Sequence, residues 1–160
     1  MKKKVLILLV MSMLFSFFGG CTKTVEIGDV VYLSFSYSTG YSMNSRTLYK
    51  FDSREGSPVV TIKPFGKADE MAQEYIVDEE FVNRLTTILK ENSVGKWNGF
   101  KKNDKHVLDG DDFDMYIVFS DESSIEASGY EKYPAGYSEV KDALDELFGG
   151  LWQEIDNIEE

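Results

Sequence analysis

Alternating apolar and polar side chains in the first half of the chain predict three successive β-strands. In residues 30–38, VVYLSFSYS, the large side chains of one face are Val31, Leu33, Phe35 and Tyr37. Because successive side chains of a strand point to opposite sides of the sheet, this strand is expected to bury that face. Residues 47–52 and 58–64 predict two further strands, joined by polar turns in meander order.

Helical periodicity predicts two helices. Asp78 is expected to cap a helix that ends near Asn92, because two glutamates follow it in the first turn, where the helix dipole favours anions. The apolar stripe of this helix is Phe81, Leu85, Ile88 and Leu89. A second helix is expected from about residue 138 to residue 156, with a bend or break at Gly149 and Gly150.

The remaining segments have weaker patterns. Residues 68–77 contain helix-favouring side chains, but their alternation predicts a hairpin partner for the preceding strand. Residues 94–112 show no sustained period and are expected to form a long structured loop. Residues 113–119 and 124–128 then predict two strands joined by the tight turn SDES.

This order of elements predicts the fold class. Runs of strands interrupted by single helices are typical of an α+β domain, and the alternating strands favour an antiparallel sheet, since parallel strands are usually apolar throughout. We expect one domain, residues 29–158, built as an antiparallel sheet of five to six strands with two helices packed on one face.

The start of the chain predicts export and a lipid anchor. MKKK precedes 14 mainly apolar residues, 5–18, which are too few for a membrane-spanning helix, so a signal peptide of residues 1–20 is favoured over a transmembrane anchor. Gly20 and Cys21 resemble the end of the bacterial lipobox, whose cysteine becomes the lipidated N-terminus. Residues 21–28 would then form a short tether. An ordinary secretory signal with an incidental thiol is the alternative.

Charge narrows the range of partners. The sequence has 17 basic and 28 acidic side chains, and loss of Lys2, Lys3 and Lys4 with the signal peptide would leave a net charge of −14. Such a surface repels phosphates, so we expect no nucleic-acid partner. An anionic bilayer surface would also repel this acidic domain, so attachment to the membrane would depend on the acyl group at Cys21. Export followed by this attachment would place the domain on the extracytoplasmic face of the cell membrane.

Four carboxylates of the segment VLDGDDFD are a calcium candidate: Asp109, Asp111, Asp112 and Asp114. Calcium sites use this density of oxygen ligands, but the spacing does not fit an EF-hand. A glycine turn followed by outward-pointing carboxylates is the simpler interpretation. We therefore expect no metal and no other cofactor.

His106 is the single histidine of the sequence. One alternative function is a hydrolase that acts on envelope material through carboxylates and His106. The sequence G-x-S-x-G, which would indicate a nucleophile elbow, does not occur. An exposed loop histidine is therefore the favoured interpretation, and no catalytic residue is assigned.

Two aromatic clusters provide the candidate binding residues. Trp97 and Phe100 belong to the segment WNGF, and Tyr130, Tyr133 and Tyr137 surround a proline before the last helix. Exposed aromatic rings can stack on sugars or anchor a protein partner. The same residues could instead close the end of the sheet, and this structural role is the favoured interpretation.

The segments WNGF, VLDGDDF and IEASGYEKYPAGYSEVKDALDELF also resemble a family of small bacterial lipoproteins and secreted proteins, found mostly in gut-dwelling Firmicutes. The resemblance covers roughly residues 77–148. The family has no established activity, so the resemblance implies an extracytoplasmic domain and assigns no catalytic residue. The matching positions are Trp97, Gly99, Phe100, Asp109, Gly110, Phe113, Gly129, Tyr130, Pro134 and Tyr137.

These observations predict a lipid-anchored binding or interaction module at the bacterial cell envelope, with an unknown protein or glycan as its partner. The hydrolase is one alternative function. An inhibitory or structural partner of another envelope protein is the other.

Overall fold

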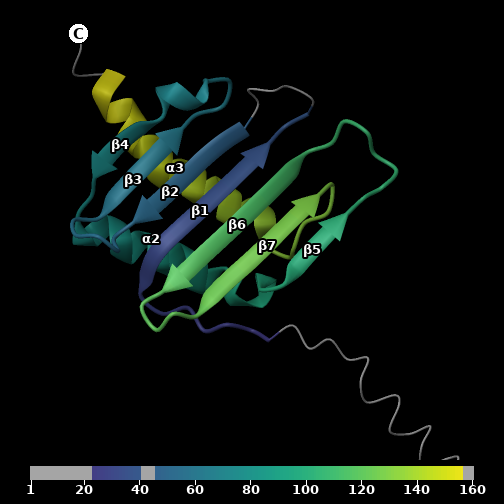
Figure 1. Cartoon of the computed structure of the whole chain (residues 1–160), viewed down its shortest axis with the longest axis horizontal. Coiled ribbons are helices and arrows are strands. Elements are labelled where there is room, and N and C mark those ends of the chain that lie inside the picture. The colour runs from purple at the N-terminus through teal and green to yellow at the C-terminus, as the bar shows by residue number, and fades with distance from the viewer. Residues whose placement is uncertain (1–22, 41–45, 157–160) are drawn as a thin grey trace, which may run out of the picture.

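A computed structural model describes residues 23–40 and 46–156 as a seven-stranded sheet with two helices on one face (Figure 1). The signal peptide and Cys21 lie outside the described residues, so their predicted processing stays a prediction. The strands follow the order β4-β3-β2-β1-β6-β7-β5 across the sheet. Their bounds are β1 (Val30–Ser38), β2 (Arg46–Asp52), β3 (Val59–Lys63), β4 (Gln73–Ile76), β5 (Phe100–Asn103), β6 (Asp112–Phe119) and β7 (Ser124–Tyr130). The helices are α2 (Glu79–Glu91) and α3 (Tyr137–Asp156), with 3₁₀ turns η2 (Asp69–Met71) and η3 (Val94–Trp97).

The α+β prediction is confirmed, but the sheet is larger and less regular than expected. Strands β1, β2, β3, β6 and β7 form where alternation predicted them, and β4 pairs with β3 as the expected hairpin partner, shortened by η2. The prediction of a purely antiparallel sheet is wrong at one edge. There β5, inside the segment expected to be a loop, pairs in parallel with β7. Its sequence, FKKN, has one apolar residue and therefore no alternation to detect.

The core lies between the sheet and the two helices. Fully buried side chains of the central strands include Leu33, Phe35, Phe51, Phe113, Met115 and Ile117. The helices contribute Phe81, Leu85 and Leu89 from α2 and Val140, Leu144 and Phe148 from α3. Val30 is buried in place of the expected Val31, because the register of β1 with β6 shifts between Val30 and Tyr32.

Both helices begin close to their predicted starts. The Asp78 carboxylate accepts a hydrogen bond from the Phe81 N–H at 3.0 Å and so caps α2, whose last turn is closed by Asn92. The prediction of a break at Gly149 and Gly150 is wrong, because α3 continues through both residues to Asp156. Packing of α3 on the sheet outweighs the loss of about 1 kcal/mol that each helical glycine costs.

Asp145 ties α3 to the sheet. One of its carboxylate oxygens accepts hydrogen bonds from the hydroxyls of Tyr37, on β1, and Tyr49, on β2, at 2.7 and 2.8 Å. The other oxygen accepts from Lys141 at 2.8 Å. Burial, reinforced by the nearby Asp145 carboxylate, raises the pKa of Tyr37 and that of Tyr49 above the ordinary tyrosine value. Both hydroxyls therefore remain protonated donors well into the alkaline range.

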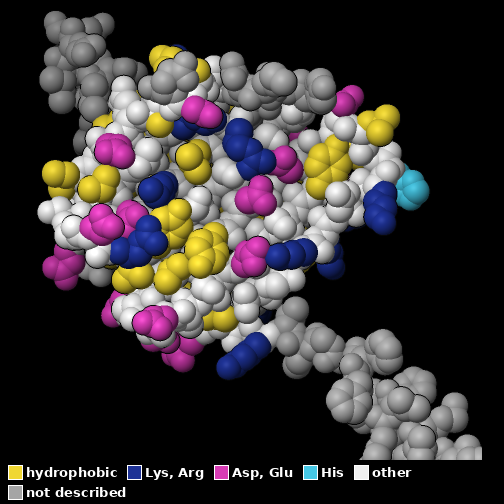
Figure 2. Space-filling model, viewed as in Figure 1, with side chains coloured by type: hydrophobic (Ala, Val, Ile, Leu, Met, Phe, Trp, Pro, Cys, Tyr) yellow, Lys and Arg dark blue, Asp and Glu magenta, His cyan; other side chains and the backbone are white. Residues whose placement is uncertain are grey.

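The face of the sheet turned away from the helices carries intermixed basic and acidic side chains (Figure 2). Its ion pairs join Arg46 to Asp112 and Asp114, Arg54 to Asp52, and Lys101 to Glu126. Arg54 also lies over the ring of Tyr32, 4.3 Å from its centroid. The cations of this face are thus largely neutralised by neighbouring carboxylates.

The segment before β1 lies against η3. The Val25 N–H donates to the Gly95 carbonyl at 3.0 Å, and the Asn98 side chain donates to the Lys23 carbonyl at 3.3 Å. Val25 and Ile27 also pack on the core. A Cβ at Gly95 would lie 1.9 Å from the Val25 carbonyl oxygen, so only glycine permits this crossing. Residues 23–28, expected to belong to a tether, are therefore docked on the domain.

Candidate functional site

The loop between β7 and α3, residues 131–136, is fixed at both ends by hydrogen bonds. Asp111 and Glu131 are joined twice, through the Glu131 N–H to the Asp111 carbonyl at 2.9 Å and through the Asp111 N–H to the Glu131 carboxylate at 2.6 Å. The buried indole of Trp97 donates to the Ala135 carbonyl at 3.0 Å. These hydrogen bonds hold both ends of the loop, against the start of β6 and against η3.

Close packing beneath this loop depends on Gly129. A Cβ there would lie 2.0 Å from the carbonyl oxygen of Lys132 and 2.7 Å from the ring of Phe113. The loop backbone thus rests directly on β7, as a strand glycine allows. Gly129 and Phe113 both belong to the segments that carry the family resemblance, and here they serve to position the loop.

Tyr133 is the outermost member of a stack of rings. Its centroid lies 4.6 Å from that of Tyr137, and Tyr137 lies 4.7 Å from the buried Phe113. The Tyr133 hydroxyl donates to the Asp111 carbonyl at 3.2 Å, yet 38% of the residue is exposed. Partial burial and the negative charge of Glu131 raise the pKa of Tyr133 to about 12, which keeps the hydroxyl protonated. The ring is therefore held by a stacked neighbour and a hydrogen bond while part of it stays accessible.

Tyr133 forms one wall of a groove of about 510 Å³ beside β5, which we call the aromatic groove. Its size falls in the range of small-molecule sites. The residues that line it are Asn92, Ser93, Lys96, Trp97, Phe100, Lys102, Tyr133, Pro134, Ala135 and Gly136. The Lys102 ammonium lies over the Phe100 ring, 5.2 Å from its centroid, as a cation–π contact.

The aromatic candidates from the sequence divide into two groups. Trp97, Phe100 and Tyr133 line the aromatic groove, although Trp97 is only 2% exposed and its indole contributes mainly to the fixed floor. Tyr137 lies beneath Tyr133 in the ring stack. Tyr130 lines a different hollow, with Lys101 and Asn103 among its neighbours, and its hydroxyl accepts a hydrogen bond from a backbone N–H at 2.7 Å.

Three of the four carboxylates of the calcium candidate have other partners. Asp112 and Asp114 pair with Arg46 at 2.5 and 3.2 Å, and the Asp111 carboxylate accepts the Gly40 N–H at 2.8 Å. Asp109 is exposed at the turn. Within residues 23–40 and 46–156, no group of three or more His, Cys, Asp or Glu side chains is placed to hold a metal ion.

His106 is exposed on the turn that follows β5. Its backbone N–H donates to the Asp104 carboxylate at 3.1 Å, and Asp104 also pairs with Lys132 at 2.8 Å. Hydrogen bonds from the Lys132 side chain and the His106 N–H lower the pKa of Asp104. His106 lies outside the residues that line the aromatic groove, so the structure does not bring it together with the aromatic candidates.

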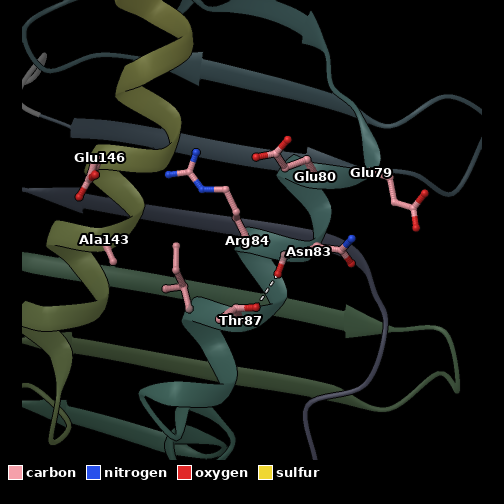
Figure 3. A pocket seen from close by; sticks show the side chains of 8 residues that line it. Glu79, Glu80, Asn83, Arg84, Thr87, Ala143 and Glu146 are labelled. Atoms are coloured by element: carbon pink, nitrogen blue, oxygen red, sulfur yellow. Dashed lines mark hydrogen bonds between the residues drawn. The ribbon is translucent and has the colours of Figure 1, made fainter.

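A second groove, of about 560 Å³, runs between α2 and α3 (Figure 3). Arg84 points into the space between the helices, with Glu80 on the same helix and Glu146 on the facing one. Arg84 forms no ion pair with any residue that the structure describes. These long side chains are exposed, and ordering them would cost conformational entropy. The interhelical groove is consequently less preorganised than the aromatic groove.

The sequence matches no model of a known protein family and no curated protein. Among the described helices, none is both long enough and apolar enough to span a membrane. The fold and the site together define an α+β domain with an aromatic-walled groove.

Sequence reasoning missed the two basic residues of the aromatic groove, Lys96 and Lys102. Lysine is common on surfaces, and neither residue belongs to a periodic pattern. The signal that could have identified them is the segment KWNGFKK, in which basic residues flank an aromatic motif in an otherwise acidic chain.

Proposed function

We propose that the protein is a lipid-anchored binding module on the extracytoplasmic face of the bacterial cell membrane, and that it holds a saccharide of the envelope in the aromatic groove. One observation carries this proposal. The ring of Tyr133 is exposed, yet it is fixed by a stacked neighbour and by the hydrogen bond of its hydroxyl.

A saccharide suits this combination of rigid and polar groups. Sugar rings present C–H groups that pack on an aromatic face, while their hydroxyls bind polar groups at the edge of the ring. Asn92 and Ser93 add polar side chains to the same lining. Because Tyr133 is already ordered, little conformational entropy is lost when a ligand stacks on it.

The anchoring part of the proposal is supported by the sequence around Cys21, where an apolar run ends in Gly20 and a single cysteine. Two acyl chains hold a protein on a membrane stably, whereas one does not. A binding module held in this way would meet its ligands at the membrane surface, where envelope saccharides are attached or synthesised.

A hydrolase acting through His106 is the alternative function, and the geometry favours it less. General acid–base catalysis needs a proton-transferring group within hydrogen-bond reach of the substrate. The aromatic groove is lined by lysines, aromatic rings and small polar residues, whereas His106 lies on the separate turn after β5. The third possibility, a structural or inhibitory partner of another protein, has no specific contact in its favour.

The test is saccharide binding by the full-length protein in mild detergent, first on an array of envelope-type saccharides and then by titration of the best ligand. Replacing Tyr133→Ala removes an aromatic contact worth about 0.5–1.5 kcal/mol, so affinity should fall about 2- to 12-fold. Tyr116→Ala is the matched control, because Tyr116 is 44% exposed on β6, outside the groove. Absence of any saccharide binding, or equal loss in both variants, would contradict the proposal.

A further inference from the structure

The aromatic groove differs in charge from the rest of the molecule. The charged residues that line it are both lysines, Lys96 and Lys102, in a chain whose net charge is −11. Resting on the proposed function, we propose that the saccharide bound in the groove is acidic, and that Lys96 and Lys102 hold its anionic group. A positive site on a negative protein selects such a ligand by local complementarity, since charge complementarity governs specificity more than affinity.

Both lysines are available to a ligand. Neighbouring basic residues are already paired: Lys101 with Glu126 and Lys132 with Asp104, each at 2.8 Å. Neither Lys96 nor Lys102 forms an ion pair with any residue in the described part of the chain, and both are exposed. An anionic group in the groove would therefore gain two cations without displacing an existing carboxylate.

The two helix ends beside the groove do not determine the sign of its charge. The C-terminal end of α2, at Asn92, and the start of α3, after Gly136, both border the groove. A helix carries about half a negative charge at its C-terminus and about half a positive charge at its N-terminus, so these two contributions oppose each other. Glu131, whose charge adds to burial in raising the pKa of Tyr133, lies outside the lining, so the two lysines are the charged side chains that a ligand in the groove would meet directly.

The charge and the stacking surface lie within reach of one small ligand. The Lys102 ammonium lies 5.2 Å from the Phe100 ring centroid, and Phe100 and Tyr133 line the same groove of about 510 Å³. An acidic peptide would share the charge preference. However, a groove of about 510 Å³ suits a compact ring better than an extended chain.

The experiment measures binding of matched pairs by full-length protein in detergent: oligogalacturonate against its methyl ester, sialyllactose against lactose, and mannose 6-phosphate against mannose. We expect at least one acidic member to bind about tenfold more tightly than its neutral partner at low salt. That preference should weaken as salt shortens the Debye length towards about 8 Å. An acidic peptide of comparable charge is included as a competitor.

Single variants locate the effect. Lys96→Gln and Lys102→Gln should each reduce the preference for the acidic member at least threefold, whereas Lys105→Gln, which removes the same charge from an exposed residue outside the groove, should leave it unchanged. Equal binding of acidic and neutral members, tighter binding of the peptide, or equal effects of all three variants would overturn the inference. If binding depends on Tyr133 but not on these lysines, the proposed function survives and the acidic preference fails. If no saccharide binds, both fail.

Discussion

Gly129→Ala should destabilise the protein because its Cβ has no space. The added carbon would lie 2.0 Å from the Lys132 carbonyl oxygen, whereas ordinary contacts begin at 3.4 Å, so the loop must retreat by about 1.4 Å. Overpacking of this kind costs about 1–3 kcal/mol. Displacing the loop also strains the Trp97–Ala135 hydrogen bond, which contributes about 1 kcal/mol. We therefore expect a loss of about 2–4 kcal/mol, a large part of a typical stability of about 5–15 kcal/mol.

The same substitution in α3 provides a matched control. Gly149 has no atom within 4 Å of the position its Cβ would occupy, apart from the helix itself. Alanine is favoured over glycine in a helix by about 0.5–1 kcal/mol, so Gly149→Ala should stabilise the protein by that amount. The two variants carry the same chemical change and are expected to shift stability in opposite directions.

Urea unfolding followed by tryptophan fluorescence measures both variants. With a slope of about 2 kcal/mol per molar urea, Gly129→Ala should lower the midpoint by about 1–2 M, while the slope itself stays unchanged. Gly129→Ala should also weaken saccharide binding, because the displaced loop carries Tyr133. If Gly129→Ala unfolds at the same midpoint as the unmodified protein, the loop is not packed on β7 as described.

Two further predictions concern the anchor and alkaline pH. Cys21→Ser should release the protein from membranes without changing its unfolding midpoint, and unchanged membrane fractionation would refute lipidation. The pKa values of Tyr37 and Tyr49 are raised in the folded state, so their contribution to the free energy of unfolding should be fully present below about pH 10. Above that pH the free energy of unfolding should fall by up to about 1.4 kcal/mol per pH unit for each tyrosine. Urea midpoints from about pH 8 to pH 11 measure this decline; Tyr49→Phe should make it shallower, and a constant midpoint would contradict it.

Most of the fold was predictable because its elements have local signatures. Apolar and polar side chains alternate along strand β1. Helix α2 follows Asp78, whose carboxylate accepts a hydrogen bond from the Phe81 N–H in the first turn. Strand β5 had no such signature, since a short segment with one apolar residue becomes a strand only through its parallel pairing with β7, which is distant along the chain. The shift from Val31 to Val30 in the core also depends on pairing, because β6 imposes the irregular register.

The candidate site was only half visible in the sequence. The aromatic residues were identified by their type, but residue type does not show that Trp97 is buried and Tyr133 exposed. That difference in exposure depends on where the loop 131–136 lies. Lys96 and Lys102 acquire significance only because η3 and β5 place them on one groove. Local patterns show which side chains are present, whereas the sign of the charge in a groove and the accessibility of its lining depend on tertiary packing.

The docking of the N-terminal segment on η3 sets how freely an acylated domain could turn. If the chain is cleaved before Cys21, only Cys21 and Thr22 precede Lys23, whose carbonyl accepts a hydrogen bond from Asn98. Two residues reach at most about 7 Å, so lipidation would hold η3 close to the bilayer and limit how far the domain can turn. Because η3 supplies Trp97 to the groove, the effective concentration of a membrane-linked ligand would be raised there. Occupancy would then depend on the surface density of that ligand more than on intrinsic affinity.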